Sequence, residues 1–396
     1  MEILRNFLPH KEVLDLSHHN ALFSQMLSLI PGHVFQKLEH RHRTGRLSRK
    51  FGFREQFTVM AFIRLAARRS MRDGLRCPGA AGTRLYHWGP KNVARSTLAD
   101  ASTSRPVAFF QDMFTEMYSL CAGKAPKHKS RFKSGLFSLD ATAIRLCLWL
   151  FLRASFRQPK GGIRMHTLLD HDGHIPSLVA VTDAKAHESR MVRTLELSRG
   201  SIVVLDKGHI SYPRFRTLGA KGVFFVTRLK RNAVYKLPER RPANRNTGVT
   251  SDHIIEVVSG KTSLRLRRIG YRDRESGRHC KFPTSHFRLS SKTIADIYRE
   301  RWKIEPFFKE TKQDLRIKGF VGNPENAVLI QPYTALTVYL LPACQKFLSR
   351  LRLSLQQLFQ LVQLNLLGAA PLEELLSPRR RKNENTYNFS LLKLTS

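Results

Sequence analysis

Four consecutive apolar residues, Ile202–Leu205, constrain the fold more than any other feature of the sequence. A strand that is apolar at every position is buried on both faces, whereas a half-exposed strand alternates apolar and polar residues. A strand covered on both sides requires further layers, which are usually helices. A second short run, Val223–Val226, repeats the pattern. The sequence therefore predicts an α/β fold with a central sheet.

Further strands are predicted upstream of that run. Leu136–Asp140, Ile163–Leu169 and Ile175–Val181 are strand-like, and the last two are joined by the turn-forming segment Asp170–Gly173. An acidic segment ending in Asp-Gly between two apolar runs is typical of a hairpin. A metal-binding loop is the alternative, but no EF-hand spacing follows. Ala184–Leu197 has a helical pattern, so we expect a mixed sheet with helices.

The segments on either side of this core differ from it in pattern. Before residue 124 the apolar residues recur at helical spacing, and residues 230–290 alternate as strands do. A helix beginning near Ser96 is compatible with a helix-turn-helix reader of DNA, and a plain capped helix is the alternative. The chain is predicted to begin with a helical domain, residues 1–123, and a basic linker, 124–133. The core follows in two parts, residues 134–229 and a helix at 291–325, which are separated by a β-rich insertion at 230–290. C-terminal helices at 326–378 and a loose basic tail at 379–396 complete the chain.

The charge of the chain points to a polyanionic partner. The chain has 68 Lys and Arg against 30 Asp and Glu, a formal net charge of +38. Nucleic acid is the first candidate partner and a membrane surface is the second. Membrane insertion is not expected, because the most apolar stretch, Leu336–Cys344, is far shorter than the roughly 20 residues of a membrane span. The N-terminus lacks a signal-peptide pattern and the five cysteines are scattered, which favours a reducing cytoplasm.

Two aspartates follow apolar strand-like runs. Asp140 closes the run that begins at Leu136, and Asp206 closes Ile202–Leu205. A carboxylate at the end of a buried strand has lost hydration, and a metal ion or a phosphate-bound cation would compensate for it. The alternative is that each aspartate simply caps the following turn.

A predicted helix near residue 300 places chemically useful side chains on one face. At 100° per residue, Tyr298, Arg301, Glu305 and Lys312 fall within a sector of about 60°. An acid sharing a stripe with cations and a tyrosine suits a site that holds both a metal and phosphate oxygens. An exposed helix with ion pairs along its surface is the alternative. Trp302 lies beside the stripe and is expected to belong to the core.

These residues resemble a known signature. Tyr298, Arg301, Glu305 and Lys312 match the Tyr-(2)-Arg-(3)-Glu-(6)-Lys signature of bacterial insertion-sequence transposases of the DDE type, in the insertion-sequence-four family. The family's other motifs are similar to segments that occur in the same order along this chain: Ser138–Thr142, Lys160–Asp170, Leu205–His209, Phe225–Lys230 and Glu325–Val328. In the N-terminal half, one subgroup is similar to Ile30–Phe35, Leu85–His87 and Ser96–Asp100. The resemblance thus spans nearly the whole chain.

The resemblance implies a ribonuclease-H-like catalytic core carrying a β-rich insertion, preceded by a helical domain that binds DNA ends. Asp140, Asp206 and Glu305 would hold two Mg²⁺ ions, for which Mn²⁺ can substitute. Tyr298, Arg301 and Lys312 would clamp phosphates, with Arg228 and Lys230 as further DNA contacts. The implied activity is cut-and-paste transposition on double-stranded DNA, with the ends paired by a homodimer in the bacterial cytoplasm at the nucleoid.

One departure from the family pattern supports an alternative. Pro306 follows Glu305 directly, and proline in a helix interior costs about 3 kcal/mol and kinks the helix. A kink there could misplace Glu305, so a decayed copy that binds DNA without cleaving it is the second hypothesis. A general ribonuclease or junction nuclease is a third, although it does not explain the signature helix or the large insertion.

Overall fold

The computed structural model describes residues 21–43, 51–68, 70–80, 93–128, 135–145, 162–183, 196–230, 232–259, 262–273, 275–313, 315, 324–368, 372 and 375. Within these residues, nine strands form one sheet in the order β3-β2-β1-β4-β5-β9-β8-β7-β6. The predicted helix at Ala184–Leu197 falls almost entirely outside the described residues. The α/β prediction is confirmed at the level of a mixed sheet with helices.

The first half of the sheet contains the strands predicted from the apolar runs. β1 (Leu136–Arg145), β2 (Gly162–Asp170) and β3 (Ile175–Asp183) form an antiparallel meander, and the turn after Asp170 is the predicted hairpin. β4 (Ile202–Leu205) and β5 (Phe224–Thr227) add in parallel to β1. β4 is buried at all four positions, as its continuous apolar run predicts.

Alternate residues of β4 enter two different cores. Val203 and Leu205 pack with Phe215 of α8 (Tyr212–Ala220) on one face of the sheet. Ile202 and Val204 pack with Ile294 of α9 (Ser291–Glu300) on the other face. Period-two alternation therefore places α8 and α9 on opposite faces, and any polar residue in register with Ile202 and Val204 faces α9.

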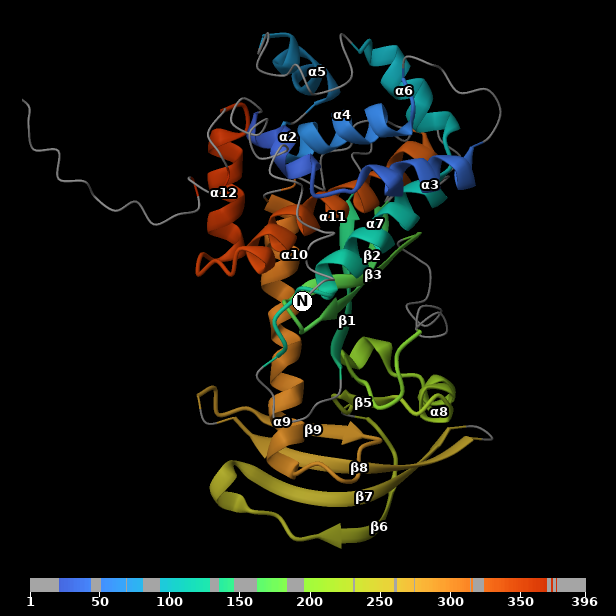
Figure 1. The fold of residues 1–396 in the computed structure, drawn as a ribbon. Helices are drawn as coiled ribbons and strands as arrows, with labels where there is room; N and C mark the ends of the chain where they lie inside the picture. The colour runs from blue at the N-terminus through green and yellow to red at the C-terminus, as the bar shows by residue number, and fades with distance from the viewer. Residues whose placement is uncertain are drawn as a thin grey trace, which may run out of the picture.

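The segment predicted as a β-rich insertion, called the insertion below, extends the same sheet. β6 (Lys236–Arg241), β7 (Val249–Ser259), β8 (Thr262–Arg272) and β9 (His279–Thr284) are antiparallel, and the short 3₁₀ turn η5 (Arg245–Thr247) precedes β7. β9 joins β5 through one residue pair, Val226 with Thr284. Figure 1 shows β6–β9 at the bottom of the molecule, running crosswise to β1–β3.

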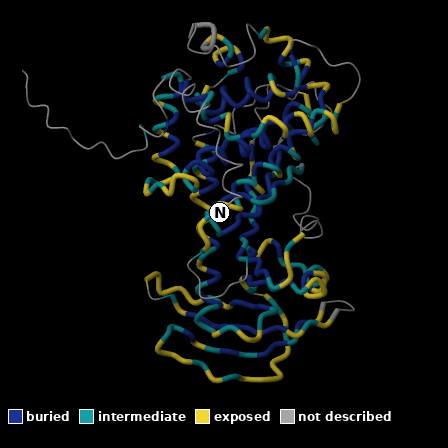
Figure 2. The backbone as a smooth tube through the Cα atoms, in the orientation of Figure 1, coloured by how far each residue is buried: buried dark blue, intermediate teal, exposed yellow. Residues whose placement is uncertain are grey.

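Helices make up the upper part of the molecule in Figure 1. Their bounds are α2 (Leu22–Leu27), α3 (Gly32–His42), α4 (Phe53–Leu65), α5 (Met71–Ala80), α6 (Arg95–Ser104), α7 (Val107–Ala122), α11 (Glu325–Leu348) and α12 (Leu355–Asn365). Residues of α4, α7 and α11 share one core with β2 and β3, and Figure 2 shows this part of the chain to be mostly buried. The N-terminal and C-terminal helices thus cover one end of the sheet together.

α11 lies almost entirely within the region that the sequence predicts to be helical, residues 326–378. It runs for 24 residues through Pro332 and Pro342, so the apolar stretch Leu336–Cys344 is one part of a longer helix. By length and composition alone it could cross a membrane, but 94% of its most apolar window is buried inside the protein. Its prolines are tolerated because it is packed on all sides by α4, α6, α7 and α12.

The segment that carries the signature residues is a broken helix. α9 ends at Glu300, a 3₁₀ turn η6 (Arg301–Lys303) follows, and α10 (Ile304–Gln313) then begins. In Figure 1 the two helices form a column between the insertion and the helical part. Pro306 lies in the first turn of α10, where its missing N–H has no carbonyl partner to lose. The break occurs where the proline ring would otherwise clash with the carbonyl of Trp302.

Candidate active site

Asp140 and Asp206 lie side by side on the same face of the sheet. Leu139 of β1 pairs with Leu205 of β4, so the next residue of each chain segment is an aspartate. Both aspartates are in register with residues that face α9, namely Leu136 in β1 and Ile202 in β4. Asp140 does not close its strand as the sequence suggested, because β1 continues to Arg145 by pairing with β2. β4 ends at Leu205, so Asp140 of β1 has no strand partner on its β4 side.

Arg301 connects two of the three predicted acids. Its Nη1 lies 3.2 Å from Oδ2 of Asp140, and its Nη2 lies 3.3 Å from Oε1 of Glu305. The side chain of Arg301 is 11% exposed, whereas those of Asp140 and Glu305 are 22% and 62% exposed. The guanidinium therefore fills the space between the sheet and the start of α10.

The pKa values of Asp140 and Arg301 respond to burial and to the charged groups around them. Burial raises the pKa of Asp140, and the negative charge of Asp206 adds to that rise. Burial acts to lower the pKa of Arg301, but Tyr298, Asp140, Asp206 and Glu305 together raise it above its ordinary value. Each of the three acids thus acts electrostatically on one guanidinium.

Tyr298 and Trp302 have different environments. Tyr298 is buried and stacks on Phe282 of β9 with ring centroids 4.4 Å apart, and the Arg301 guanidinium lies 5.8 Å from the Tyr298 ring. Trp302 was expected in the core, but it is 45% exposed. Trp302 lies in η6, and a 3₁₀ turn has fewer residues per turn than an α-helix. The side chain therefore points in a different direction from the one expected for an unbroken α-helix.

A basic groove begins at Asp206. It has a volume of about 940 Å³, and its lining includes Asp206, Lys207, Arg228, Lys230, Tyr235 and Lys281. Arg228 and Lys230, the two further DNA contacts predicted from the sequence, therefore lie beside Asp206. The sequence reasoning missed Lys207 and Lys281. The position of Lys207 directly after Asp206 could have identified it, whereas Lys281 enters only because β9 pairs with β5.

The remaining signature residue, Lys312, lies apart from this groove in the structure. It is seven residues beyond Glu305, about two helical turns along α10. Its Nζ lies 6.0 Å from the ring centroid of Phe308. Among the predicted site residues, the structure thus brings together Asp140, Asp206, Tyr298, Arg301 and Glu305, with Arg228 and Lys230 along the groove.

His209 is a further residue that the sequence reasoning did not include in the site. It is 4% exposed, and its backbone N–H donates to the carbonyl of Asp206, 2.9 Å away, within the 3₁₀ turn η4 (Lys207–His209). A proton on its ring would lower the pKa of Asp140. A histidine three residues after a strand-end aspartate is the only sequence signal for this position.

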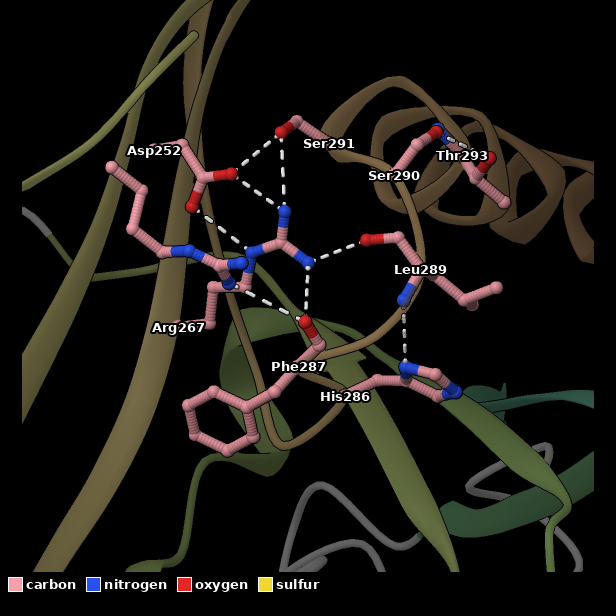
Figure 3. A network of polar contacts seen from close by, with 9 residues as sticks. Asp252, Arg267, His286, Phe287, Leu289, Ser290, Ser291 and Thr293 are labelled. Atoms are coloured by element: carbon pink, nitrogen blue, oxygen red, sulfur yellow. Dashed lines mark hydrogen bonds and ion pairs between the residues drawn. The ribbon is translucent and has the colours of Figure 1, made fainter.

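A buried ion pair in the insertion holds the N-terminal end of α9. Arg267 of β8 donates to both carboxylate oxygens of Asp252 in β7, at 2.9 and 2.6 Å, and to the carbonyl of Phe287 at 3.2 Å. Ser291, the first residue of α9, donates its hydroxyl to Asp252 at 2.6 Å. Figure 3 shows Arg267 between the strand pair and the loop that leads into α9. The insertion is thereby attached to α9, the helix that leads directly into Arg301.

The donor chemistry of the acids suits a hard divalent cation, but their arrangement is incomplete. Carboxylate oxygens are the ligands that Mg²⁺ and Mn²⁺ prefer. Asp140 and Asp206 fit such an ion because they share a face and follow a paired position of adjacent parallel strands. Within the described ranges, no three His, Cys, Asp or Glu side chains lie close enough together to hold a metal ion. Arg301 holds Glu305 instead.

Comparison with known proteins identifies the family. The family model described as "Transposase DDE domain" matches residues 131–341, more than half of the chain, and a domain of unknown function, DUF4372, matches residues 18–91. A protein of Sinorhizobium fredii named as transposase y4zB is 30% identical over 72% of this chain and 81% of its own length. A protein of Geobacillus stearothermophilus named as the transposase of insertion sequence element IS5377 is 23% identical over 82% of this chain and 85% of its own length.

Among solved structures, the piggyBac transposase synaptic complex with hairpin DNA aligns with 96% of this chain and 86% of its own, at 11% identity and a TM-score of 0.41. The family model covers both aspartates and extends through α9 and α10. The chain therefore belongs to the DDE transposase family and is a DNA transposase.

Proposed function

We propose that this transposase excises a bacterial insertion sequence and joins it to target DNA by metal-dependent hydrolysis and strand transfer, as in the insertion-sequence-four family. The main observation in support is that Asp140 and Asp206 both lie on the sheet face covered by α9, next to Arg301 and Glu305. The strand order supports a ribonuclease-H-like core, since an antiparallel meander continues into two parallel strands. The proposal keeps a helical DNA-end-binding domain over residues 1–123 and a β-rich insertion over 230–290.

Different residues of the site would bind the metal ions and the DNA phosphates. Asp140, Asp206 and Glu305 would hold two Mg²⁺ ions, which when bound would activate the nucleophile and stabilise the leaving oxygen. Arg228 and Lys230 line the groove from Asp206 and would neutralise phosphates along one DNA strand. Arg301 can present a planar fork to a phosphate, and Lys312 a point charge. The ring of buried Tyr298 lies 5.8 Å from the Arg301 guanidinium and would help to hold it in position.

Several parts of the proposal concern the setting of the reaction. The substrate is double-stranded DNA, both the terminal inverted repeats of the element and the target. The excess of 38 positive charges suits such a polyanion and a location at the bacterial nucleoid in the cytoplasm. A homodimer is proposed for the active complex, because two ends must be cut and joined together.

The decayed-copy alternative is not favoured. It depended on Pro306 misplacing Glu305, but the proline lies in the first turn of α10 and Glu305 keeps its contact with Arg301. The family model also spans every strand of the sheet together with α9 and α10.

Cleavage of labelled DNA that carries the inverted repeats bracketing the coding region tests the proposal. Asp140→Asn, Asp206→Asn and Glu305→Gln should each lower Mg²⁺-dependent cleavage by at least about 10³-fold, since each removes a ligand charge. DNA binding, measured by gel shift, should persist in all three. Glu310→Gln is the matched control, because Glu310 lies on the same helix and faces Tyr339. Full cleavage by Glu305→Gln would refute the assignment of that residue.

A further inference from the structure

The position of Arg301 raises a question that the proposed function does not answer. The guanidinium bonds to Asp140 at 3.2 Å and to Glu305 at 3.3 Å, in the space that a metal ion would need. The other oxygen of Asp140, Oδ1, accepts the backbone N–H of Ala141 at 2.8 Å. Both oxygens of Asp140 are therefore engaged.

Arginine is a strong competitor for these carboxylates. A guanidinium stays protonated at any physiological pH, so it cannot be removed by losing a proton. A divalent cation placed beside it would be repelled by its positive charge at a separation of a few ångströms. Metal binding to Asp140 together with Glu305 thus requires the Arg301 side chain to leave its present position.

We infer that Arg301 is a latch on the metal site: without DNA it bridges Asp140 and Glu305 and keeps divalent metal out, and a DNA phosphate draws it away so that metal can bind. This inference rests on the proposed function, because it assumes that the acids are metal ligands. It adds that metal loading and DNA binding are coupled through one side chain.

A phosphate is a suitable trigger for three reasons. Its oxygens match the guanidinium fork and can replace both carboxylates as acceptors. The Nε of Arg301 is buried and has no hydrogen-bond partner among the described residues, and an unsatisfied buried donor makes the present position easier to leave. A small pocket of about 70 Å³ adjoins Arg301 and reaches Asp206, Arg228 and Trp302, so the displaced side chain has a place to go.

Glu305 is free to change partner once Arg301 has moved. Its side chain is 62% exposed, and it lies in the first turn of α10, directly after the 3₁₀ break. A flexible, solvated carboxylate at that position can rotate towards the sheet without moving the helix. The latch therefore explains why Asp140 and Glu305 bond to one guanidinium near Asp206 but, within the described part of the chain, the three acids do not form a metal-binding group.

Mn²⁺ binding to the full-length protein, followed by the electron paramagnetic resonance signal of free Mn²⁺, tests the latch without measuring activity. In the absence of DNA, Arg301→Gln should bind Mn²⁺ about tenfold more tightly than the unmodified chain. Lys303→Gln is the matched control, since Lys303 lies in the same 3₁₀ turn but its Nζ pairs with Glu300 at 2.5 Å. It should bind Mn²⁺ as the unmodified chain does.

A short DNA duplex of mixed sequence provides a second measurement that needs no variant. Adding it should tighten Mn²⁺ binding to the unmodified chain by about the same factor, and Mn²⁺ should tighten DNA binding equally, because coupling is reciprocal. The duplex should have little effect on Mn²⁺ binding to Arg301→Gln. Equal Mn²⁺ affinity in Arg301→Gln and the unmodified chain, both without DNA, would overturn the latch.

The outcomes also separate the latch from the proposed function. Asp140→Asn introduced into Arg301→Gln should abolish the tight Mn²⁺ site, which assigns it to the acids. If the unmodified chain already binds Mn²⁺ tightly through Asp140 without DNA, the metal site stands and only the latch fails. If no variant binds Mn²⁺ with or without the duplex, both the metal site and the latch fail.

Discussion

Single residues on β1 and β4 determine where the chemistry is placed. Val203 and Leu205 face α8, so their alternating neighbours Ile202 and Val204, and then Asp206, face α9. Moving Asp206 by one position would bury it in the α8 core instead. The same alternation along β1 brings Asp140 to the α9 side. The candidate site is therefore fixed by the side-chain period of two strands.

His171 gives a prediction at this scale. It is 1% exposed, its Nε2 lies 2.8 Å from the Ser138 hydroxyl, and burial lowers its pKa to about 3, helped by His174 and Lys303. In the unfolded chain the His171 imidazole takes up a proton near pH 6.5, whereas in the folded chain it stays neutral at that pH. Folding stability is therefore lost progressively as the pH falls below about 6.5, by about 1.4 kcal/mol at about pH 5.5 from this residue.

Urea unfolding at about pH 7.5 and pH 5.5 measures this loss. His171→Gln should reduce the difference between the two pH values by about 1.4 kcal/mol, while the exposed His33→Gln should leave it unchanged. An identical pH dependence in His171→Gln and the unmodified chain would show that the residue is not a buried neutral histidine.

At the scale of elements, the attachment of α9 to the insertion is expected to be critical. Arg267 and Asp252 are both almost fully buried and bond to each other and to Ser291. Removing one partner leaves an unpaired buried charge, so Arg267→Ala should lower the free energy of unfolding by about 3–5 kcal/mol. Replacing both partners, as Arg267→Met with Asp252→Leu, should cost less, since no charge is left unpaired. Urea unfolding compares the variants, and equal stability of Arg267→Ala and the unmodified chain would contradict this view.

The break between α9 and α10 supports a different expectation for Pro306. Proline in the first turn of a helix loses no hydrogen bond, so Pro306→Leu should change the unfolding free energy by less than about 1 kcal/mol. Mg²⁺-dependent DNA cleavage should also change little. A large gain in cleavage by Pro306→Leu would show that the proline does impair the placement of Glu305.

Much of the element order could be predicted because local pattern determines it. The apolar run at Ile202–Leu205 predicts a strand buried on both sides, and the Asp-Gly turn after Asp170 predicts a hairpin, and both are present. Breaks within helices, and helices that continue through prolines, were harder to predict. Periodicity alone cannot show that a 3₁₀ turn at Arg301–Lys303 exposes Trp302, or that tertiary packing carries α11 through Pro332 and Pro342.

The site was predictable only in part for the same reason. The i, i+4 spacing of Arg301 and Glu305 indicates an ion pair on one helix, but the bond from Arg301 to Asp140 joins residues that are distant in the sequence. Lys281 likewise enters the groove through the pairing of β5 and β9. Contacts between distant segments depend on the assembled sheet, which no single window of sequence contains.

At the scale of the whole molecule, the excess positive charge should govern affinity for DNA. Neutralising one lysine that binds a phosphate should reduce the slope of log K against log salt concentration by about 0.9. Lys230→Gln and Lys281→Gln in the groove should each reduce the slope by that amount. Arg265→Gln is the control, because Arg265 is paired with Glu239 on the insertion, outside the groove lining. Unchanged slopes for both groove variants would mean that DNA follows another path.

The most direct measurement asks whether Asp140, Asp206 and Glu305 hold divalent metal together when DNA is bound. Fe²⁺ bound in place of Mg²⁺ reduces added hydrogen peroxide to hydroxyl radicals, with ascorbate returning Fe³⁺ to Fe²⁺. The radicals cut the polypeptide next to the ligands of the iron, and the cut sites can be mapped by mass spectrometry on the DNA complex. We expect three clusters of cuts, near residues 140, 206 and 305, all suppressed by excess Mg²⁺. Cuts at other segments, or cuts that omit any one of the three acids, would contradict a shared metal site.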